Sequence, residues 1–464
     1  MKKKFELIYI IVFFIILIIP LTSMLTGIEA SNHENRRLSV MPDILVNNRI
    51  NTGFPLEFET YFSENFGLRP LFISAYGALN YYLLNHSVND QVIKGKEGQL
   101  FFSKTLPDYT GENAMTPFEI DKLYKVIEIQ KQWLEHLGTE FIFMPVPNKN
   151  TVYPQYMPAR YKKSQDKHNI NLLNDLFENS DIKYVNLTEL FSGWDECLYQ
   201  KTDTHWNDYG ATIAYNEMIR LFKGVANNYE AHFDYEKGRT GDLANMLMPA
   251  FGIKEIKPVV KTNNNYRYIK PIRSFDDMKI ETECDCNEST VLMFRDSFAN
   301  SLIPVISDNF GYCLYSRGVP PDYRLVNEQK FDLVVLEIVE RNLRDLLCNV
   351  PIMPALPVDI KIEEQRSDAD SEITINVSDE YGLTKITGLI SGVLTNEIYV
   401  HTGGNLYQAF PIVDNQNEFD TDEQLSSVFS IYLENDMSIG GNIQILYRSP
   451  SGNFINSNFV LFRY

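Results

Sequence analysis

The sequence has few cysteines, and those that it has are not spaced like a metal site. Five cysteines are spread over 464 residues. This is too few for a disulfide scaffold, and an odd number cannot pair completely. Cys284 and Cys286 lie in ECDCN without a second cysteine or histidine pair at the spacing of a zinc site. We therefore expect no metal and no cofactor. One disulfide stays open, although free thiols are the simpler interpretation.

Basic residues are also in deficit. There are 42 lysines and arginines against 61 acidic residues, which gives a formal net charge of −19. Such a field repels polyanions, so we expect no nucleic-acid partner and favour a neutral or weakly charged glycan over a strongly anionic one. Hydrophobic residues make up 44% of the chain, which is enough for two or three folded domains at this length.

The N-terminus carries the one long hydrophobic run. Residues 7–28 hold no charge and follow Lys2, Lys3 and Lys4, and about 20 apolar residues suffice to span a bilayer. The basic flank predicts that the N-terminus is inside and the rest of the chain outside. We interpret residues 1–28 as a retained anchor and 29–53 as a stalk. The alternative, a signal peptide cleaved near Ala30, requires an unusually long apolar region.

The middle of the chain alternates strand-like and helix-like segments. Continuous apolar runs at 141–147, 291–294 and 331–339, with a shorter one at 184–187, are separated by amphipathic stretches. This pattern predicts an α/β domain over residues 54–348, with a mostly parallel sheet covered by helices on both faces. The polar region 223–290 reads as an insertion.

A change of composition marks a second domain. Residues 349–372 are rich in proline and then in charge, as in a linker. Beyond them come short β-type runs separated by turn residues. We predict an all-β sandwich over 373–464, a candidate carbohydrate-binding module.

The candidate catalytic residues lie in two segments of the sequence. In KTDTHWN, Asp203 lies two residues before His205, so a carboxylate can fix the imidazole tautomer. In VLMFRDSFANSL, an apolar strand ends at a turn that contains Ser297, and sites of α/β proteins lie at such strand ends. In acyl-transfer catalysis, a serine can act as the nucleophile, a histidine as the general base and an aspartate as the group that orients the histidine. The structural alternatives are a chance Asp-x-His and a helix cap formed by Asp-Ser.

With these motifs the sequence resembles a known family. TDTHWNDYGA (202–211) and FRDSFANSLIP (294–304) look like the alginate O-acetylation proteins of the SGNH-hydrolase-like superfamily, including their DHHW relatives. The likeness spans roughly residues 54–348. It implies a three-layer SGNH-hydrolase-like fold and a triad of Asp203, His205 and Ser297. The triad order is reversed relative to ordinary GDSL esterases, which agrees with the circular permutation described for the family. Arg295 replaces the glycine of GDSL sequences, which leaves the oxyanion geometry open.

The resemblance also implies the activity and its partners. We expect a membrane-tethered, extracytoplasmic serine O-acetyltransferase that acts on an exported polysaccharide and receives acetyl groups from a multi-spanning membrane acyltransferase. An acetylesterase with the same triad shares the first half-reaction and stays open. A non-catalytic glycan-binding assembly protein is the third alternative, with a platform of sandwich aromatics (Tyr399, Tyr407, Phe410 and Tyr432).

Further residues are weaker candidates. We name four as candidate substrate-binding residues: Arg295, Trp206, Lys149 and Asn148. Each has a structural alternative, such as a core aromatic for Trp206 or a loop-closing contact for Lys149. Arg341 is interpreted as the structural ion-pair partner of Glu337 or Glu340, with substrate binding as the alternative. Asp242 is interpreted as a turn residue, with a position lining the cleft as the alternative.

Overall fold

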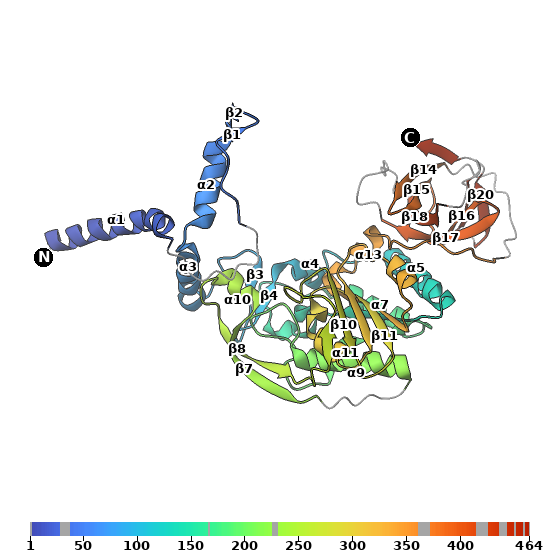
Figure 1. The fold of residues 1–464 in the computed structure, drawn as a ribbon, viewed down its shortest axis with the longest axis horizontal. Coiled ribbons are helices and arrows are strands. Elements are labelled where there is room, and N and C mark those ends of the chain that lie inside the picture. Colours follow the sequence, from blue (N-terminus) through green and yellow to red (C-terminus); the bar gives the residue numbers. More distant parts are fainter. Residues whose placement is uncertain are drawn as a thin grey trace.

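The fold was analysed in a computed structural model (Figure 1). It describes residues 2–27, 38–165, 168–224, 231–360, 372–413, 426–435, 443–449, 452–457 and 460–463. Residue 28 at the end of the predicted anchor, residues 29–37 of the predicted stalk and 361–371 of the predicted linker lie outside the described residues.

Three helices form the N-terminal part. Helix α1 (Lys2–Thr26) contains the stretch Glu6–Thr26, which among the described residues is the one helical segment long and apolar enough to cross a membrane. Both a single-pass anchor and a signal sequence fit this finding. Helices α2 (Phe54–Asn65) and α3 (Arg69–Leu83) follow, after the small hairpin β1 (Leu45–Val46) and β2 (Arg49–Ile50).

A mixed seven-stranded sheet forms the centre of the molecule. Its order is β6-β5-β13-β11-β12-β10-β9, and the five strands from β6 to β12 are parallel, whereas β10 and β9 are antiparallel. The bounds are β5 (Glu140–Val146), β6 (Lys183–Tyr184), β9 (Tyr266–Tyr268), β10 (Lys279–Cys284), β11 (Thr290–Phe294), β12 (Tyr312–Ser316) and β13 (Leu333–Val339). The predicted central sheet is present as a mixed sheet, and the predicted N-terminal apolar helix and C-terminal β module are also present.

Alternating side chains of the central strands enter two different cores. Phe141 and Phe143 of β5 pack with helices α5 and α7, whereas Ile142 and Met144 pack with α8, α9 and α11. This alternation follows from the two-residue period of a strand. The helices are α5 (Pro117–His136), α7 (Asn169–Phe177), α8 (Leu187–Ser192), α9 (Asp208–Lys223) and α11 (Ile303–Ser307). Helix α5 starts at the N-cap Thr116, which forms a full capping box with Glu119.

Short elements connect these layers. They are β3 (Val92–Lys94), β4 (Leu100–Phe102), α4 (Leu106–Thr110), α6 (Lys149–Val152), β7 (Phe233–Thr240), α10 (Asp242–Leu247), β8 (Lys254–Val260), α12 (Arg324–Glu328), α13 (Asp345–Cys348) and the 3-10 turns η1 (Ser103–Thr105), η2 (Pro154–Tyr156), η3 (Phe298–Ser301) and η4 (Glu340–Asn342). The interpretation of 223–290 as an insertion is too broad, because β9 and β10 are strands of the central sheet. A disulfide joins Cys284 and Cys286 at the end of β10.

The C-terminal part is all β and packs on helix α5. One eight-stranded sheet has the order β20-β19-β16-β17-β18-β15-β14-β21, antiparallel except for the pair of β14 and β21. Phe410 and Tyr432 join the core around α5, and the sheet lies against that helix in Figure 1. Its strands are β14 (Ile373–Glu380), β15 (Leu383–Ser391), β16 (Ile398–Thr402), β17 (Asn405–Ile412), β18 (Ser426–Glu434), β19 (Gln444–Arg448), β20 (Phe454–Ser457) and β21 (Val460–Arg463).

The aromatics proposed as a sugar platform lie inside this module. Tyr399, Tyr407, Phe410 and Tyr432 are all buried, so they cannot present a flat surface to a glycan. The sugar-platform interpretation is wrong for these four side chains, which are strand-core aromatics instead.

Candidate functional site

A tight loop between two ordered segments presents Asp203 and His205. Leu198 O accepts from Asn207 N at 2.8 Å, and His205 O accepts from Gln200 N at 3.2 Å, so the ends of the loop are joined. Asn207 then caps helix α9, because its side chain accepts from the N–H groups of Tyr209 and Gly210. His205 is thereby held at the start of a rigid helix.

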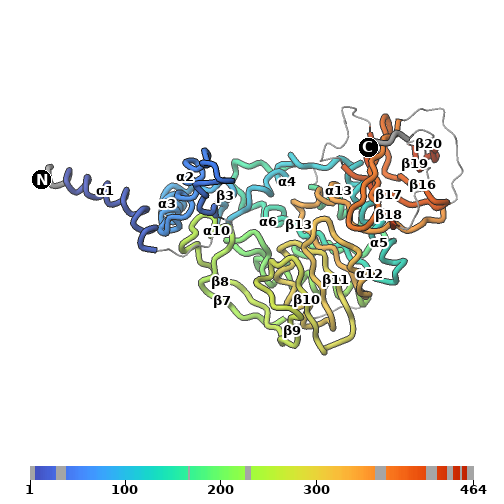
Figure 2. Tube along the Cα trace, turned by 45° about the horizontal axis from the view of Figure 1, so that its top comes forward, coloured from blue at the N-terminus to red at the C-terminus, as the bar shows by residue number. Residues whose placement is uncertain are grey.

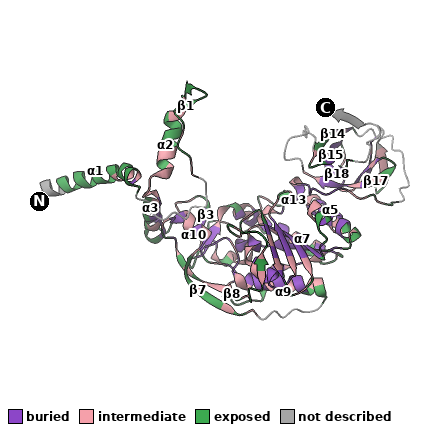
Figure 3. Ribbon diagram, in the orientation of Figure 1, coloured by how far each residue is buried: buried purple, intermediate pink, exposed green. Residues whose placement is uncertain are grey.

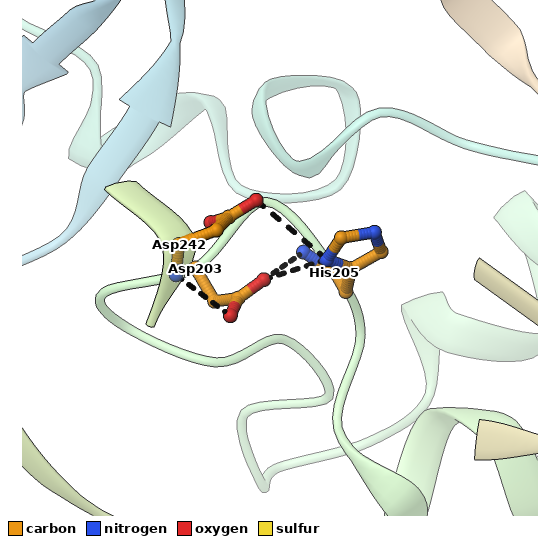
Figure 4. A group of neighbouring side chains, drawn as sticks. All are labelled: Asp203, His205 and Asp242. Atoms are coloured by element: carbon orange, nitrogen blue, oxygen red, sulfur yellow. Dashed lines mark hydrogen bonds and ion pairs between the residues drawn. The ribbon is translucent and has the colours of Figure 1, made fainter. Parts of the chain in front are cut away.

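Asp203 holds the imidazole from one side (Figure 4). Its Oδ1 lies 2.7 Å from His205 Nδ1 and also accepts from His205 N at 3.0 Å. Its Oδ2 accepts from Asp242 N at 3.0 Å. Burial raises the pKa of Asp203, but the attraction to His205, the hydrogen bonds from His205 and the charge of Lys257 outweigh it, so the pKa lies well below its usual value. Asp203 is therefore an ionised, oriented acceptor for the Nδ1 proton.

Ser297 lies on the other side of the ring. Its Oγ is 2.8 Å from His205 Nε2, and both side chains are half-buried, so a substrate can reach them. Burial lowers the pKa of His205, whereas the carboxylates of Asp203, Asp242 and Asp296 raise it, with a net rise above the usual value. The imidazole is thus a stronger base than a free histidine.

The turn that carries Ser297 is fixed by its neighbour Asp296. Strand β11 ends at Phe294, and Asp296 accepts from Phe298 N at 2.8 Å and from Val339 N at 2.9 Å. Asp296 N donates to Glu337 at 2.9 Å, which ties the turn to β13. Burial and the adjacent Asp296 raise the pKa of Glu337 well above its usual value, so this carboxyl keeps its proton beside the Asp296 carboxylate.

The four candidate substrate-binding residues lie near this centre but are occupied by protein contacts. The Arg295 guanidinium donates to Phe275 O at 2.5 Å, Asp277 O at 3.2 Å and Asn300 Oδ1 at 2.6 Å. Trp206 is fully buried, and its Nε1 donates to Phe298 O at 2.8 Å. The structure thus places both side chains under the Ser297 turn, where they support it.

Lys149 and Asn148 lie on the far side of the Asp203 loop. Lys149 Nζ donates to the backbone carbonyls of Leu100, Gln200, Lys201 and Asp203, at 2.6 to 3.2 Å. Burial lowers the pKa of Lys149 to about 8. Asn148 is fully buried and donates to Asp108 at 2.9 Å. Lys149 therefore acts on the site through the loop that it closes.

Asp242 is a second carboxylate at the site, which sequence reasoning treated as a turn residue. It accepts from Thr204 N at 2.8 Å and from Thr204 Oγ1 at 2.6 Å, and its Oδ2 is 3.8 Å from His205 Nδ1 (Figure 4). Burial and the charge of Asp203 raise the pKa of Asp242 to about 6. In the sequence, Asp242 lies in TGDLANML (240–247), a segment that gives no information on its distance from His205.

Asp203, His205 and Asp242 are also, among the described residues, the one group of potential metal ligands whose atoms converge. However, His205 Nδ1 faces Asp203 at 2.7 Å, and Asp242 Oδ2 accepts from Thr204. Their hydrogen-bonding capacity is directed at one another, which is the arrangement of a proton-orienting network.

Arg341 takes a different position from the one expected. Its guanidinium lies over the ring of Phe298 at 5.5 Å and over that of Phe102 at 5.7 Å. The salt bridges found among the described residues include none from Arg341 to Glu337 or Glu340. Glu337 accepts from Asp296 N, and Glu340 accepts from Asn148 N and Thr151 Oγ1. The predicted ion pair is therefore wrong, and a cation lies beside the residue that follows Ser297.

Comparison with known proteins agrees with the motifs. Residues 92–274 match the family model described as SGNH hydrolase-like domain, acetyltransferase AlgX. This range contains Asp203 and His205 and ends before Ser297. The chain is 24% identical over 197 residues to the "Probable alginate O-acetylase AlgJ" of Pseudomonas fluorescens, over 40% of this chain and 48% of that protein. It thus spans about half the length of this curated relative.

Two solved structures are also similar. PatB1 of Bacillus cereus has a TM-score of 0.43 and 18% identity, covering 55% of this chain and 97% of that one. The O-acetyltransferase domain of Pseudomonas putida AlgJ has a TM-score of 0.36 and 18% identity, covering 54% and 92%. The predicted resemblance to the alginate O-acetylation proteins is confirmed: residues 92–274 match the AlgX-type SGNH hydrolase-like family model, and the chain is similar to an AlgJ protein.

Proposed function

We propose that this protein is a serine-dependent O-acetyltransferase that modifies an exported cell-surface or exopolysaccharide through an acetyl-serine intermediate. The observation that carries the proposal is the position of His205, with Asp203 on Nδ1 at 2.7 Å and Ser297 on Nε2 at 2.8 Å. A histidine in this position can take the serine proton while the carboxylate stabilises the resulting imidazolium. The AlgX-type domain supports polysaccharide O-acetylation as the general activity.

In the first half-reaction Ser297 takes the acetyl group. The Oγ–H proton moves to His205 Nε2 as Oγ forms a bond to the acetyl carbonyl carbon. When the tetrahedral intermediate collapses, the bond to the donor's leaving oxygen breaks, and that oxygen receives the proton from His205. Asp203 holds the tautomer that leaves Nε2 free to accept.

The Ser297 backbone N–H is the candidate donor to the developing oxyanion. Within the described part of the chain no protein group accepts from it, whereas the neighbouring N–H groups of Asp296 and Phe298 donate to carboxylates. A donor that is already oriented costs little reorganisation in the transition state.

In the second half-reaction a sugar hydroxyl resolves the intermediate. His205 removes the hydroxyl proton, the sugar oxygen attacks the acetyl carbon, and Ser297 Oγ leaves with the proton returned by His205. A water molecule in place of the sugar would make the protein an acetylesterase. The two activities differ only in which acceptor reaches Ser297.

The topology suits a tethered enzyme. We propose that residues 1–28 anchor the chain, that 29–53 form a stalk, and that the domain 54–348 works outside the membrane. Residues 349–372 would then link it to the module 373–464. The donor would be a multi-spanning membrane acyltransferase that delivers acetyl groups at the outer surface. A neutral or weakly charged glycan remains the proposed acceptor, and the exposed surface of the C-terminal module is a proposed carbohydrate contact.

The decisive assay compares acetyl transfer with hydrolysis. Purified protein is incubated with a chromogenic acetyl ester and neutral or acidic oligosaccharides, and both free acetate and acetylated sugar are measured. We expect acetylated sugar to form faster than free acetate, and Ser297→Ala to lower both by about 10³-fold or more. Ser192→Ala, which removes an exposed hydroxyl, serves as the control. Acetate without acetylated sugar would assign an esterase instead.

A further inference from the structure

Helix α3 is built with its apolar side facing outward. The outward face consists of seven side chains with helical spacing, all of them exposed and none charged: Leu71, Phe72, Ala75, Tyr76, Leu79, Tyr82 and Leu83. Tyr76 is 61% and Leu83 74% exposed. A surface helix of a soluble domain shows the opposite polarity, with its apolar stripe turned to the core.

The packing of the opposite face of α3 prevents the helix from rotating about its axis to bury the apolar face. Its buried residues are Pro70, Ser74, Gly77, Asn80 and Tyr81, and Tyr81 packs in a hydrophobic cluster with Leu243 and Leu247 of helix α10. A Cβ at Gly77 would lie 2.2 Å from Leu247 O of helix α10, so only glycine allows this approach. Ser74 Oγ also accepts from Ala250 N at 2.8 Å. The rotation of α3 about its axis is therefore fixed by packing, and the apolar face points outward as part of the fold.

The position of α3 in the chain indicates what covers this face. The candidate membrane span of α1 ends at Thr26, helix α2 begins at Phe54, and helix α3 follows it directly from Arg69. Figures 1 and 2 show α1 leaving the molecule on the side where α2 and α3 lie, with its C-terminal end beside α3. In Figure 3 most of this side is exposed. With residues 1–28 as the proposed anchor, on which this step rests, the apolar face lies where the chain leaves the bilayer.

We infer that helix α3 lies in the interfacial layer of the membrane, with the face from Leu71 to Leu83 buried among the upper parts of the lipid chains. Interfacial helices of this kind bury their apolar side about 5–10 Å deep. Tyr76 and Tyr82 have the amphipathic rings that are enriched at this depth. Helix α3 contains no acidic residue, and its one basic residue is Arg69 at its first position, so neither face carries a charge into the lipid.

This contact would orient the candidate site relative to the bilayer. Helix α10, which packs on α3 through Leu247, begins at Asp242, whose N–H donates to Asp203 at 3.0 Å. Two rigid helices therefore connect the lipid surface with the Asp203–His205 pair. The inference concerns membrane placement and does not depend on which reaction Ser297 performs.

The test places a fluorescent reporter on this face. The full chain with Tyr76→Trp, and separately with Leu83→Trp, is reconstituted into phosphatidylcholine vesicles that contain lipids brominated either near the headgroup or near the chain end. Met278→Trp is the matched control, because Met278 is 63% exposed on the loop before β10. Wild-type emission is subtracted, since Trp133, Trp194 and Trp206 are also present.

We expect a blue-shifted emission at positions 76 and 83, with stronger quenching by the bromines near the headgroup than by those near the chain end. The control at position 278 should show neither effect. Emission at 76 and 83 that resembles the control would overturn the inference. Emission that shifts with protein concentration but is not quenched by lipid would instead assign the face to a second copy of this chain. Unchanged ester turnover in each variant establishes that it is folded.

Discussion

His205 faces two carboxylates of different character. Asp203 is bonded directly to Nδ1, whereas Asp242 Oδ2 is 3.8 Å away and is occupied by Thr204. Asp203 thus fixes the tautomer and Asp242 adds charge. The second carboxylate raises the basicity of the imidazole without competing for its proton, so its removal should change the pH dependence more than the geometry.

Asp242→Asn should therefore move the acid limb of the pH profile. At pH values above about 6 the Asp242 carboxylate is charged and favours protonated His205. Neutralising it lowers the His205 pKa, so the free base appears at lower pH, by up to about one pH unit. The measurement is kcat/KM against pH with a chromogenic acetyl ester.

The control for this variant is Asp285→Asn, which removes the same charge from a side chain that is 96% exposed. It should leave the profile unchanged. An acid limb of Asp242→Asn that stays in place, or moves to higher pH, would show that Asp242 does not act on the His205 charge.

Among single residues, sequence analysis could single out those that lie close together in the sequence or directly after a predicted strand. Asp203 and His205 are two positions apart, and the turn after the strand 291–294 singles out Ser297. The contacts of Asp242 and Glu337 at the site were not predicted, because their hydrogen-bond partners are about forty residues away in the sequence. The contacts of Arg295 and Lys149 with backbone carbonyls leave no pattern in the sequence either, because carbonyls belong to every residue.

Among the elements, helix α10 has the most direct effect on the site. Its first turn packs on the Asp203 loop so closely that a Cβ at Gly241 would lie 2.1 Å from Thr202 O and 2.6 Å from Asp203 N. Gly241 N donates to Thr202 Oγ1 at 3.0 Å, and Ala244 N donates to Thr202 O at 3.1 Å. The loop and the helix are thus one packed unit.

We expect Gly241→Ala to displace this unit. The added methyl group meets backbone atoms, which cannot turn aside, so the variant should lose about 1–3 kcal/mol of unfolding free energy and much of its kcat. Both are measured, by denaturant unfolding and by ester turnover. Gly193→Ala is the control, because no atom lies within 4 Å of its Cβ. A Gly241→Ala variant with wild-type turnover would contradict this account of the loop.

Secondary-structure prediction succeeded for segments whose hydrophobic period and length both indicated the same type of element. The strands at 140–146, 290–294 and 333–339 lie within a few residues of the predicted runs at 141–147, 291–294 and 331–339. The strands β9 and β10 were missed because they are polar on their outer face and lie near the sheet edge. Such strands lack the continuous apolar run of the buried parallel strands.

At the scale of the whole molecule, helix α5 joins the central sheet to the C-terminal module, because it packs against both. Trp133 Nε1 donates to Pro354 O at 2.8 Å, and Lys122 Nζ donates to Ile412 O at 2.8 Å. Composition predicted the change of domain near residue 349. Composition could not predict the contact between α5 and the C-terminal module, because the sequence of α5 has the pattern of an ordinary amphipathic helix.

Trp133→Phe should therefore weaken the joined structure. It leaves Pro354 O without its donor and removes part of a buried ring, which together cost about 1–3 kcal/mol of unfolding free energy. Trp194→Phe changes an indole that is 51% exposed and should cost close to nothing. Equal stabilities of the two variants in denaturant titrations would mean that the α5 contact contributes little.

The most direct test of the account is to trap the acetylated enzyme. The full chain is mixed with a reactive acetyl ester, quenched in acid within the first turnovers, digested and analysed by mass spectrometry. The account predicts one added acetyl group on the peptide that contains Ser297, and none there in Ser297→Ala or His205→Ala. Turnover of the ester with Ser297 never acetylated, or with Ser297→Ala as active as wild type, would contradict it.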